Sequence, residues 1–142
     1  MALAQTGVKA ITNRLPKVIS PRQHAIIDYI SAGSFVLGGL LMFKNHKRAA
    51  IASFACAAAE ANNVMMTDMP GGLWPVYSQK THAAMDAVLS TATEFLPNIM
   101  MFTDEWPAWF FRAKGLELAT VTGLTNFNFA ERSSRTRRNR AA

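Results

Sequence analysis

Apolar residues along this chain gather into four long stretches, and short polar segments separate them. The stretches cover residues 25–43, 48–67, 83–102 and 107–129. Each stretch is too long for an ordinary β-strand and long enough for a helix of several turns. The pattern therefore predicts an all-α protein whose four helices form two tandem helical hairpins.

The polar segments divide the chain into five regions. An N-terminal flank at 1–19 precedes a first hairpin at 20–68, and a connection at 69–77 leads to a second hairpin at 78–129. The last region, 130–142, is rich in Arg with Ser, Thr and Asn, and it has too few apolar residues to join a core. We expect this basic tail to be disordered.

One short sequence occurs twice, 58 positions apart, at the start of each hairpin. Residues 18–28 read VISPRQHAIID, and residues 76–86 read VYSQKTHAAMD. In each copy the Ser is a predicted N-cap, and a His and an Asp follow with the four-residue spacing that places them on one helical face. These pairs are His24 with Asp28 and His82 with Asp86. The duplication predicts that the protein contains two copies of one helical unit.

The second helix of each hairpin carries a further acidic residue, Glu60 in the first and Glu117 in the second. Because each unit is a hairpin, these helices return toward the end where the His and Asp residues begin. We therefore predict that six side chains converge in one half of the bundle: His24, Asp28, Glu60, His82, Asp86 and Glu117. Imidazole and carboxylate together suit a divalent metal such as Zn, Fe or Mn. A proton or cation relay, or a structural polar core that locks the hairpins together, would explain the same residues.

Composition favours a membrane location for these helices. Half of the residues are apolar, and the first stretch contains a single ionisable group, Asp28, over about the length that a helix needs to cross a bilayer. Aromatic residues such as Trp74, Tyr77, Trp106 and Trp109 lie between the stretches, where a membrane interface would fall. We expect an integral membrane four-helix bundle. A mean hydropathy of only +0.08 keeps a soluble four-helix bundle as the alternative.

Basic residues set the predicted orientation. With four spans both termini share one side, and that side holds ten of the 15 Lys and Arg residues. The positive-inside rule places it in the cytoplasm, in a multi-pass protein that we expect in a bacterial inner membrane. The Arg-rich tail is expected to contact anionic lipid head groups. A membrane protein complex or a homo-oligomer is a further expected partner, and nucleic acid is not expected.

Two short sequences occupy matching places in the two halves: Leu96-Pro97 precedes an apolar run in the second hairpin, and Gly38-Gly39 does so in the first. With the duplicated hairpin, they make residues 20–126 resemble the small bacterial four-span membrane proteins that carry the SPW repeat. The Ser-Pro-Trp tripeptide itself does not occur in this chain. The resemblance implies a membrane topology and brings no established activity with it.

Three classes of function follow from these features. The first is a non-enzymatic membrane protein, a scaffold or a small accessory subunit, in which the polar residues serve helix association. The second is a metal- or proton-binding membrane protein for transport or sensing, and the third is a membrane metalloenzyme. Cys56 is the single cysteine, so neither an internal disulfide nor a Cys-based metal site is expected. We take the first class as the expectation and the other two as alternatives.

Overall fold

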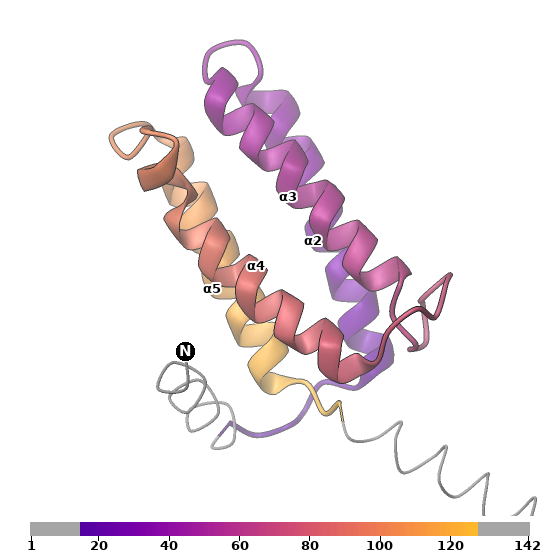
Figure 1. Ribbon diagram of the computed structural model, residues 1–142. Coiled ribbons are helices and arrows are strands. Elements are labelled where there is room, and N and C mark those ends of the chain that lie inside the picture. Colours follow the sequence, from indigo (N-terminus) through magenta and orange to yellow (C-terminus); the bar gives the residue numbers. More distant parts are fainter. Residues whose placement is uncertain (1–14, 128–142) are drawn as a thin grey trace, which may run out of the picture.

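Four α-helices account for most of the chain that the structure, a computed structural model, describes, residues 15–127 (Figure 1). They are α2 (Pro21–Met42), α3 (Lys47–Met65), α4 (Gln79–Ile99) and α5 (Pro107–Leu124). Within residues 15–127 no β-strand forms, so the predicted all-α architecture is confirmed. The basic tail at 130–142 and most of the N-terminal flank lie outside the described residues.

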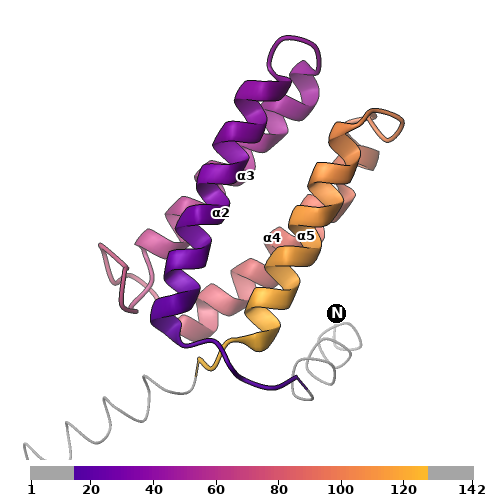
Figure 2. The same ribbon diagram turned by 180° about the vertical axis from the view of Figure 1, so that it is seen from behind.

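The helices pair as two antiparallel hairpins, α2 with α3 and α4 with α5, which lie side by side (Figures 1 and 2). Both hairpin turns lie at one end of the bundle, which we call the turn end. The connection between α3 and α4 and the segments leading to both termini lie at the opposite end. His24 and His82 lie in the first turns of α2 and α4 there, so we call it the histidine end.

The repeated sequence forms the start of a helix in both copies, as predicted. The Ser20 hydroxyl accepts a hydrogen bond from the Gln23 backbone N–H at 3.3 Å, and the Gln23 side chain accepts one from the Ser20 backbone N–H at 2.9 Å. Ser78 caps α4 in the same way, accepting from the Thr81 N–H at 3.3 Å. Both His residues follow their cap by four positions, so the caps fix where the imidazoles enter the bundle.

The last helix ends earlier than the sequence predicts, at Leu124 instead of 129. Thr125 is extended, with φ −85° and ψ 136°, and it forms a bridge with Ile19. The Ile19 N–H donates to the Leu124 carbonyl at 3.1 Å, and the Asn126 N–H donates to the Ile19 carbonyl at 2.9 Å. Pairing with the chain that leads into α2 thus replaces a further turn of α5.

Polar side chains fill the inside of the bundle toward the histidine end, whereas large apolar side chains cover its outside. The buried polar residues on or beside the helices include His24, Asp28, Ser31, Glu60, Asn63, Thr67, His82, Asp86, Thr93, Lys114 and Thr125. The exposed large apolar residues include Ile26, Ile30, Val36, Leu37, Leu40, Leu41, Ile51, Val88, Phe95, Ile99, Trp109 and Leu116. Among the described helices, α2 alone is long and apolar enough to cross a membrane, with a mean hydropathy of 1.7. That all four helices span a bilayer stays a prediction.

An apolar core fills the half of the bundle toward the turn end, where Phe35, Met42, Phe102 and Phe111 are fully buried. At the tip, Glu105 joins the two hairpin turns: it is hydrogen-bonded to His46, and its Oε1 accepts from Arg48 Nη2 at 3.1 Å. The hydrogen bond from His46 holds the pKa of the Glu105 carboxyl below its usual range. The hairpins are therefore held together at both ends.

Close packing of α4 against α5 depends on Gly115. A Cβ atom there would lie 3.0 Å from the Ser90 carbonyl oxygen and 3.1 Å from the Glu94 backbone nitrogen. We expect Gly115→Leu to lower the free energy of unfolding by about 1–3 kcal/mol, because the backbones must separate. Gly33→Leu is the matched control, since nothing lies within 4 Å of a Cβ on that residue. Denaturant unfolding followed by circular dichroism compares the two, and equal stabilities would contradict the prediction.

Candidate metal centre

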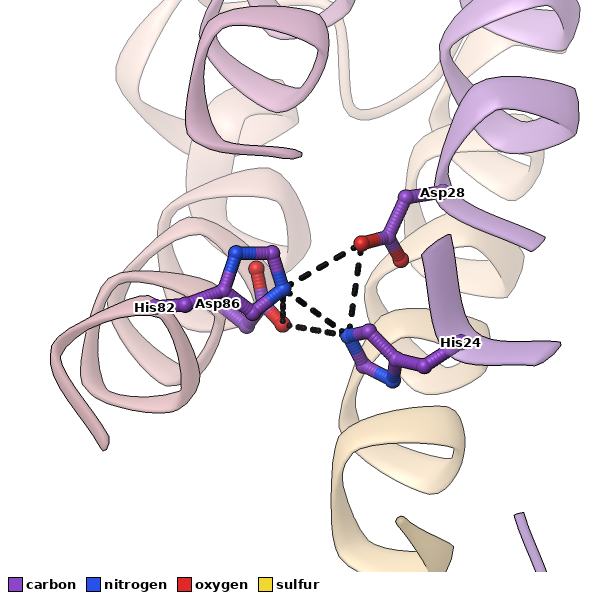
Figure 3. A group of neighbouring side chains, drawn as sticks. All are labelled: His24, Asp28, His82 and Asp86. Atoms are coloured by element: carbon purple, nitrogen blue, oxygen red, sulfur yellow. Dashed lines mark hydrogen bonds and ion pairs between the residues drawn. The ribbon is translucent and has the colours of Figure 1, made fainter. Parts of the chain in front are cut away.

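Two His and two Asp side chains meet between the hairpins at the histidine end (Figure 3). His24 and Asp28 come from α2, and His82 and Asp86 come from α4. Each residue is at most 3% exposed. One donor atom from each lies within 4.8 Å of the other three. The two copies of the repeated sequence therefore supply one half each of a single buried cluster, which we call the H2D2 centre.

Each carboxylate oxygen of the H2D2 centre lies close to both imidazole nitrogens. His24 Nε2 and His82 Nε2 lie 3.0 Å apart, and each is 3.1 Å from Asp86 Oδ2. Asp28 Oδ2 lies 3.3 Å from the first nitrogen and 3.2 Å from the second. Bond lengths of about 2.0–2.2 Å around a tetrahedral zinc ion place its ligand atoms about 3.3–3.6 Å apart. The nitrogen–nitrogen and nitrogen–oxygen separations of 3.0–3.3 Å are close to this spacing, so the four residues suit one small ion.

Nδ1 of His82, the ring nitrogen that faces away from the H2D2 centre, is held by a threonine hydroxyl. Thr67 Oγ1 lies 2.9 Å from His82 Nδ1, and it is also 2.6 Å from the Asn63 carbonyl oxygen. A carbonyl can only accept, so the single hydroxyl proton goes to Asn63, and Nδ1–H must donate to the hydroxyl oxygen. This assigns the proton of neutral His82 to Nδ1 and leaves a lone pair on Nε2, aimed into the H2D2 centre.

His24 is held in the same way by the other hairpin. Thr125 Oγ1 lies 2.8 Å from His24 Nδ1 and donates to the Val121 carbonyl at 2.7 Å. Thr67 and Thr125 are themselves 58 positions apart. Each hairpin thus provides a His and an Asp, together with the threonine that orients the His of the other hairpin. Such outer hydrogen bonds are typical of metal-binding imidazoles.

The two carboxylates differ in their surroundings. Asn63 Nδ2 donates to Asp86 Oδ1 at 2.6 Å, and Thr122 donates to Asp86 Oδ2 at 3.2 Å. The Tyr77 hydroxyl donates to Asn63 Oδ1 at 2.8 Å, which turns the Asn63 amide nitrogen toward Asp86. Burial raises the pKa of Tyr77, so this hydroxyl keeps its proton. Asp28 Oδ2, by contrast, is buried and accepts no hydrogen bond from any residue in the described segment.

Of the six predicted site residues, Glu60 and Glu117 lie outside the H2D2 centre. The Glu117 side chain is 41% exposed and pairs with Lys114 at 2.7 Å. Glu117 follows Glu60 by 57 positions, whereas the ligands repeat at 58, and one residue rotates a helical side chain by about 100°. The position that matches Glu60 in register is Leu118, which is buried in the core. The prediction that Glu117 joins the cluster is therefore wrong.

Glu60 is buried beside the H2D2 centre without being part of it. It is 1% exposed, and neither carboxylate oxygen has a hydrogen-bond partner among the described residues. On α3 it lies one turn before Asn63, the residue that contacts Asp86, and therefore about 4.5 Å farther from the histidine end. Asp28, Asp86 and Lys114 are its charged neighbours.

A buried lysine next to Glu60 was not predicted from the sequence. Lys114 is 5% exposed, and its Nζ donates to Ser31 Oγ at 2.5 Å and to Glu117 at 2.7 Å. The same ammonium lies 5.0 Å from the centre of the Phe35 ring. Position 56, its equivalent in the first hairpin, is a Cys, so the repeat offered no signal for this residue.

Known proteins do not assign a role to the H2D2 centre. No family model matches the chain, and no curated protein and no solved structure is significantly similar to it. Its function is therefore inferred from the four donor atoms and their surroundings.

Proposed function

We propose that this chain is a four-span integral membrane protein that binds one divalent transition-metal ion through His24, Asp28, His82 and Asp86. The observation that carries the proposal is the convergence of two imidazole lone pairs and two carboxylate oxygens, with each oxygen 3.1–3.3 Å from both imidazole nitrogens. Because each hairpin contributes one His and one Asp, the ion would join the two hairpins.

Charge balance favours a divalent ion. Two neutral imidazoles and two carboxylates carry a net charge of −2, which a divalent cation neutralises. Buried carboxylates without a compensating charge are costly, particularly at membrane depth. Asp28 Oδ2, which accepts no hydrogen bond from the described residues, would gain a ligand bond. Mixed nitrogen and oxygen donors suit Zn, Fe or Mn, whereas Ca²⁺ takes six to eight oxygen ligands at about 2.3–2.6 Å.

The ligand number favours a structural role over catalysis. Protein side chains supply all four positions of a tetrahedral ion, as in structural zinc sites, whereas catalytic sites keep one position for water or substrate. We therefore propose a non-enzymatic membrane scaffold or small accessory subunit whose hairpins are held together by metal. Membership of the SPW-repeat proteins remains part of this proposal, supported by the two tandem hairpins.

The distribution of side chains supports the membrane part of the proposal. Large apolar residues on all four helices are exposed, while charged and polar residues are buried between them. A bundle in water normally has the reverse arrangement, and ionisable residues in membrane helices normally face the bundle interior. The lengths of the four helices, 18 to 22 residues, match the thickness of a bilayer.

Metal titration of the detergent-purified full chain tests the proposal. We expect one equivalent of Zn²⁺ to bind per chain, and Co²⁺ in its place to give the intense visible absorption of a tetrahedral ion. Elemental analysis of protein purified without chelator measures the native metal. If Zn²⁺ and Co²⁺ do not bind, the metal proposal is wrong. The 3.0 Å separation of the two Nε2 atoms would then favour a proton shared by His24 and His82.

Loss of one outer threonine contact is expected to weaken the metal site without removing a ligand. Thr67→Val deletes the hydroxyl that accepts from His82 Nδ1, and changes of this kind typically cost about 10–100-fold in metal affinity. Thr91→Val is the matched control, because the Thr91 hydroxyl donates to the Ala87 carbonyl of its own helix and the residue is exposed. Competition with a chromophoric chelator measures both dissociation constants, and equal values would show that Thr67 does not orient the ligand.

A further inference from the structure

The geometry points to a metal site with a single entrance, an inference that rests on the proposed metal-binding function. Metal would enter and leave at the histidine end, past the ring of Phe127, and the bundle is closed to it in the direction of the turn end. The site would then exchange metal with one side of the membrane only.

Phe127 covers the outer side of the H2D2 centre. Its ring centre lies 5.0 Å from that of His24 and 6.1 Å from that of His82. Phe127 follows Thr125, whose hydroxyl holds His24, by two residues. The same short segment therefore orients one ligand and covers both imidazoles.

The segment that carries Phe127 follows the end of α5 and pairs with the chain that leads into α2. Two backbone hydrogen bonds to Ile19 hold it on one side (Figure 2 shows this crossing below the end of α5). α5 ends at Leu124, and Thr125 is its C-cap. Such a segment can move away without unfolding α5, because the helix ends before it.

The opposite side of the H2D2 centre is closed by the buried ammonium of Lys114, which is paired with Glu117. One turn inward from Asp28 lies Ser31, whose hydroxyl oxygen accepts from the buried ammonium of Lys114. A cation that moved inward from the ligands toward Glu60 would have to displace this ammonium from its bonds to Ser31 and Glu117. Lys114 therefore opposes passage of a metal ion along the bundle.

Beyond Lys114 the described interior is mainly apolar. Phe35, Met42, Phe102, Phe111 and Leu118 fill it, together with small alanines of α3. A divalent ion would have to lose its coordination to cross this region. The arrangement suits a protein that holds a metal and exchanges it with a donor or acceptor on the side of the termini, and it does not suit a channel.

The rate at which the Phe127→Ala variant releases Co²⁺ tests whether metal enters and leaves past Phe127. The purified full chain is loaded with Co²⁺, excess EDTA is added, and the loss of visible absorption is followed. We expect Phe127→Ala to release and to bind Co²⁺ at least 10-fold faster than the unaltered chain, with a dissociation constant changed less than 3-fold. Phe127→Leu, which keeps an apolar cover, should stay close to the original rate. Phe43→Ala removes an exposed ring at the turn end. It should leave the rates of Co²⁺ release and binding and the dissociation constant unchanged.

The possible outcomes distinguish failure of the single-entrance inference from failure of the proposed metal binding. Unchanged rates in Phe127→Ala would overturn the inference, and so would faster release matched by an equal loss of affinity, since that result describes a structural contact. Failure of the unaltered chain to bind Co²⁺ or Zn²⁺ would instead overturn the proposed function itself.

Zn²⁺ uptake into lipid vesicles tests whether the bundle is closed toward the turn end. The chain is reconstituted into phosphatidylcholine vesicles that contain a zinc-sensitive dye, and Zn²⁺ is added outside. The dye signal should rise no faster than in vesicles without protein. A protein-dependent rise would show a path through the bundle and would overturn the single-entrance inference.

Discussion

His24→Ala is expected to weaken Zn²⁺ binding by at least about 100-fold. Four-ligand zinc sites bind with about 10–16 kcal/mol in total, so one ligand contributes about 3 kcal/mol, and each 1.4 kcal/mol is tenfold in affinity. The alanine also leaves Thr125 without its imidazole partner and His82 Nε2 without its neighbour at 3.0 Å. His82→Ala should have the same effect, because the two residues occupy equivalent places.

The loss of metal should also appear as a loss of stability. A ligand that binds only the folded state stabilises it by about 2.7 kcal/mol at 100 times its dissociation constant. The unaltered chain should therefore unfold at higher denaturant concentration with Zn²⁺ than with EDTA, whereas His24→Ala should show almost no difference. Measuring each protein with and without metal removes the direct effect of the substitution on folding.

Glu117→Gln is the control for the ligand assignment. Glu117 is partly exposed and bonded to Lys114, so its substitution should leave the stoichiometry and affinity of metal binding unchanged. Normal affinity in His24→Ala and in His82→Ala would exclude the H2D2 centre as the binding site. Lost affinity in Glu117→Gln would mean that the ligand set is incomplete.

The duplicated sequence made the helix starts and the His–Asp pairs predictable. A Ser cap four residues before each His fixes the imidazole in the first turn, and i, i+4 spacing fixes the Asp on the same face. Two hairpins with the same start then place both pairs at one end of the bundle. Thr67 and Thr125 share the 58-residue spacing, so their place at that end was also predictable from the repeat.

What the sequence did not predict depends on register and on packing between hairpins. Glu117 resembles a partner of Glu60, but a shift of one residue turns it away from the interior and places Leu118 there instead. The burial of Lys114 depends on Ser31, which lies 83 positions away on another hairpin. The early end of α5 depends on Ile19. Contacts between distant segments decide these three features, and no local pattern encodes them.

Replacing two exposed apolar residues on the outer face of α2 by Asp is expected to abolish insertion of the chain into the membrane. Ile30 and Leu37 are 66% and 58% exposed and lie seven residues apart, on one face of the helix that is long and apolar enough to span a bilayer. A charged residue near the centre of a span costs about 2.5–3.5 kcal/mol on insertion scales. Ile30→Asp with Leu37→Asp should thus cost about 5 kcal/mol and remove the chain from the alkali-washed membrane fraction.

The same substitutions have the opposite consequence for a soluble bundle, which makes the test decisive. Exposed side chains on a protein in water tolerate substitution within about 0.5 kcal/mol, and added Asp residues increase solubility. Asn45→Asp, in the exposed hairpin turn, adds a negative charge outside the predicted span and should leave the chain in the membrane. If the doubly substituted chain accumulates as soluble protein and still binds one Zn²⁺, the H2D2 centre belongs to a bundle that folds in water. If it is lost from both fractions while Asn45→Asp remains in the membrane, the apolar outer face of α2 is in contact with lipid.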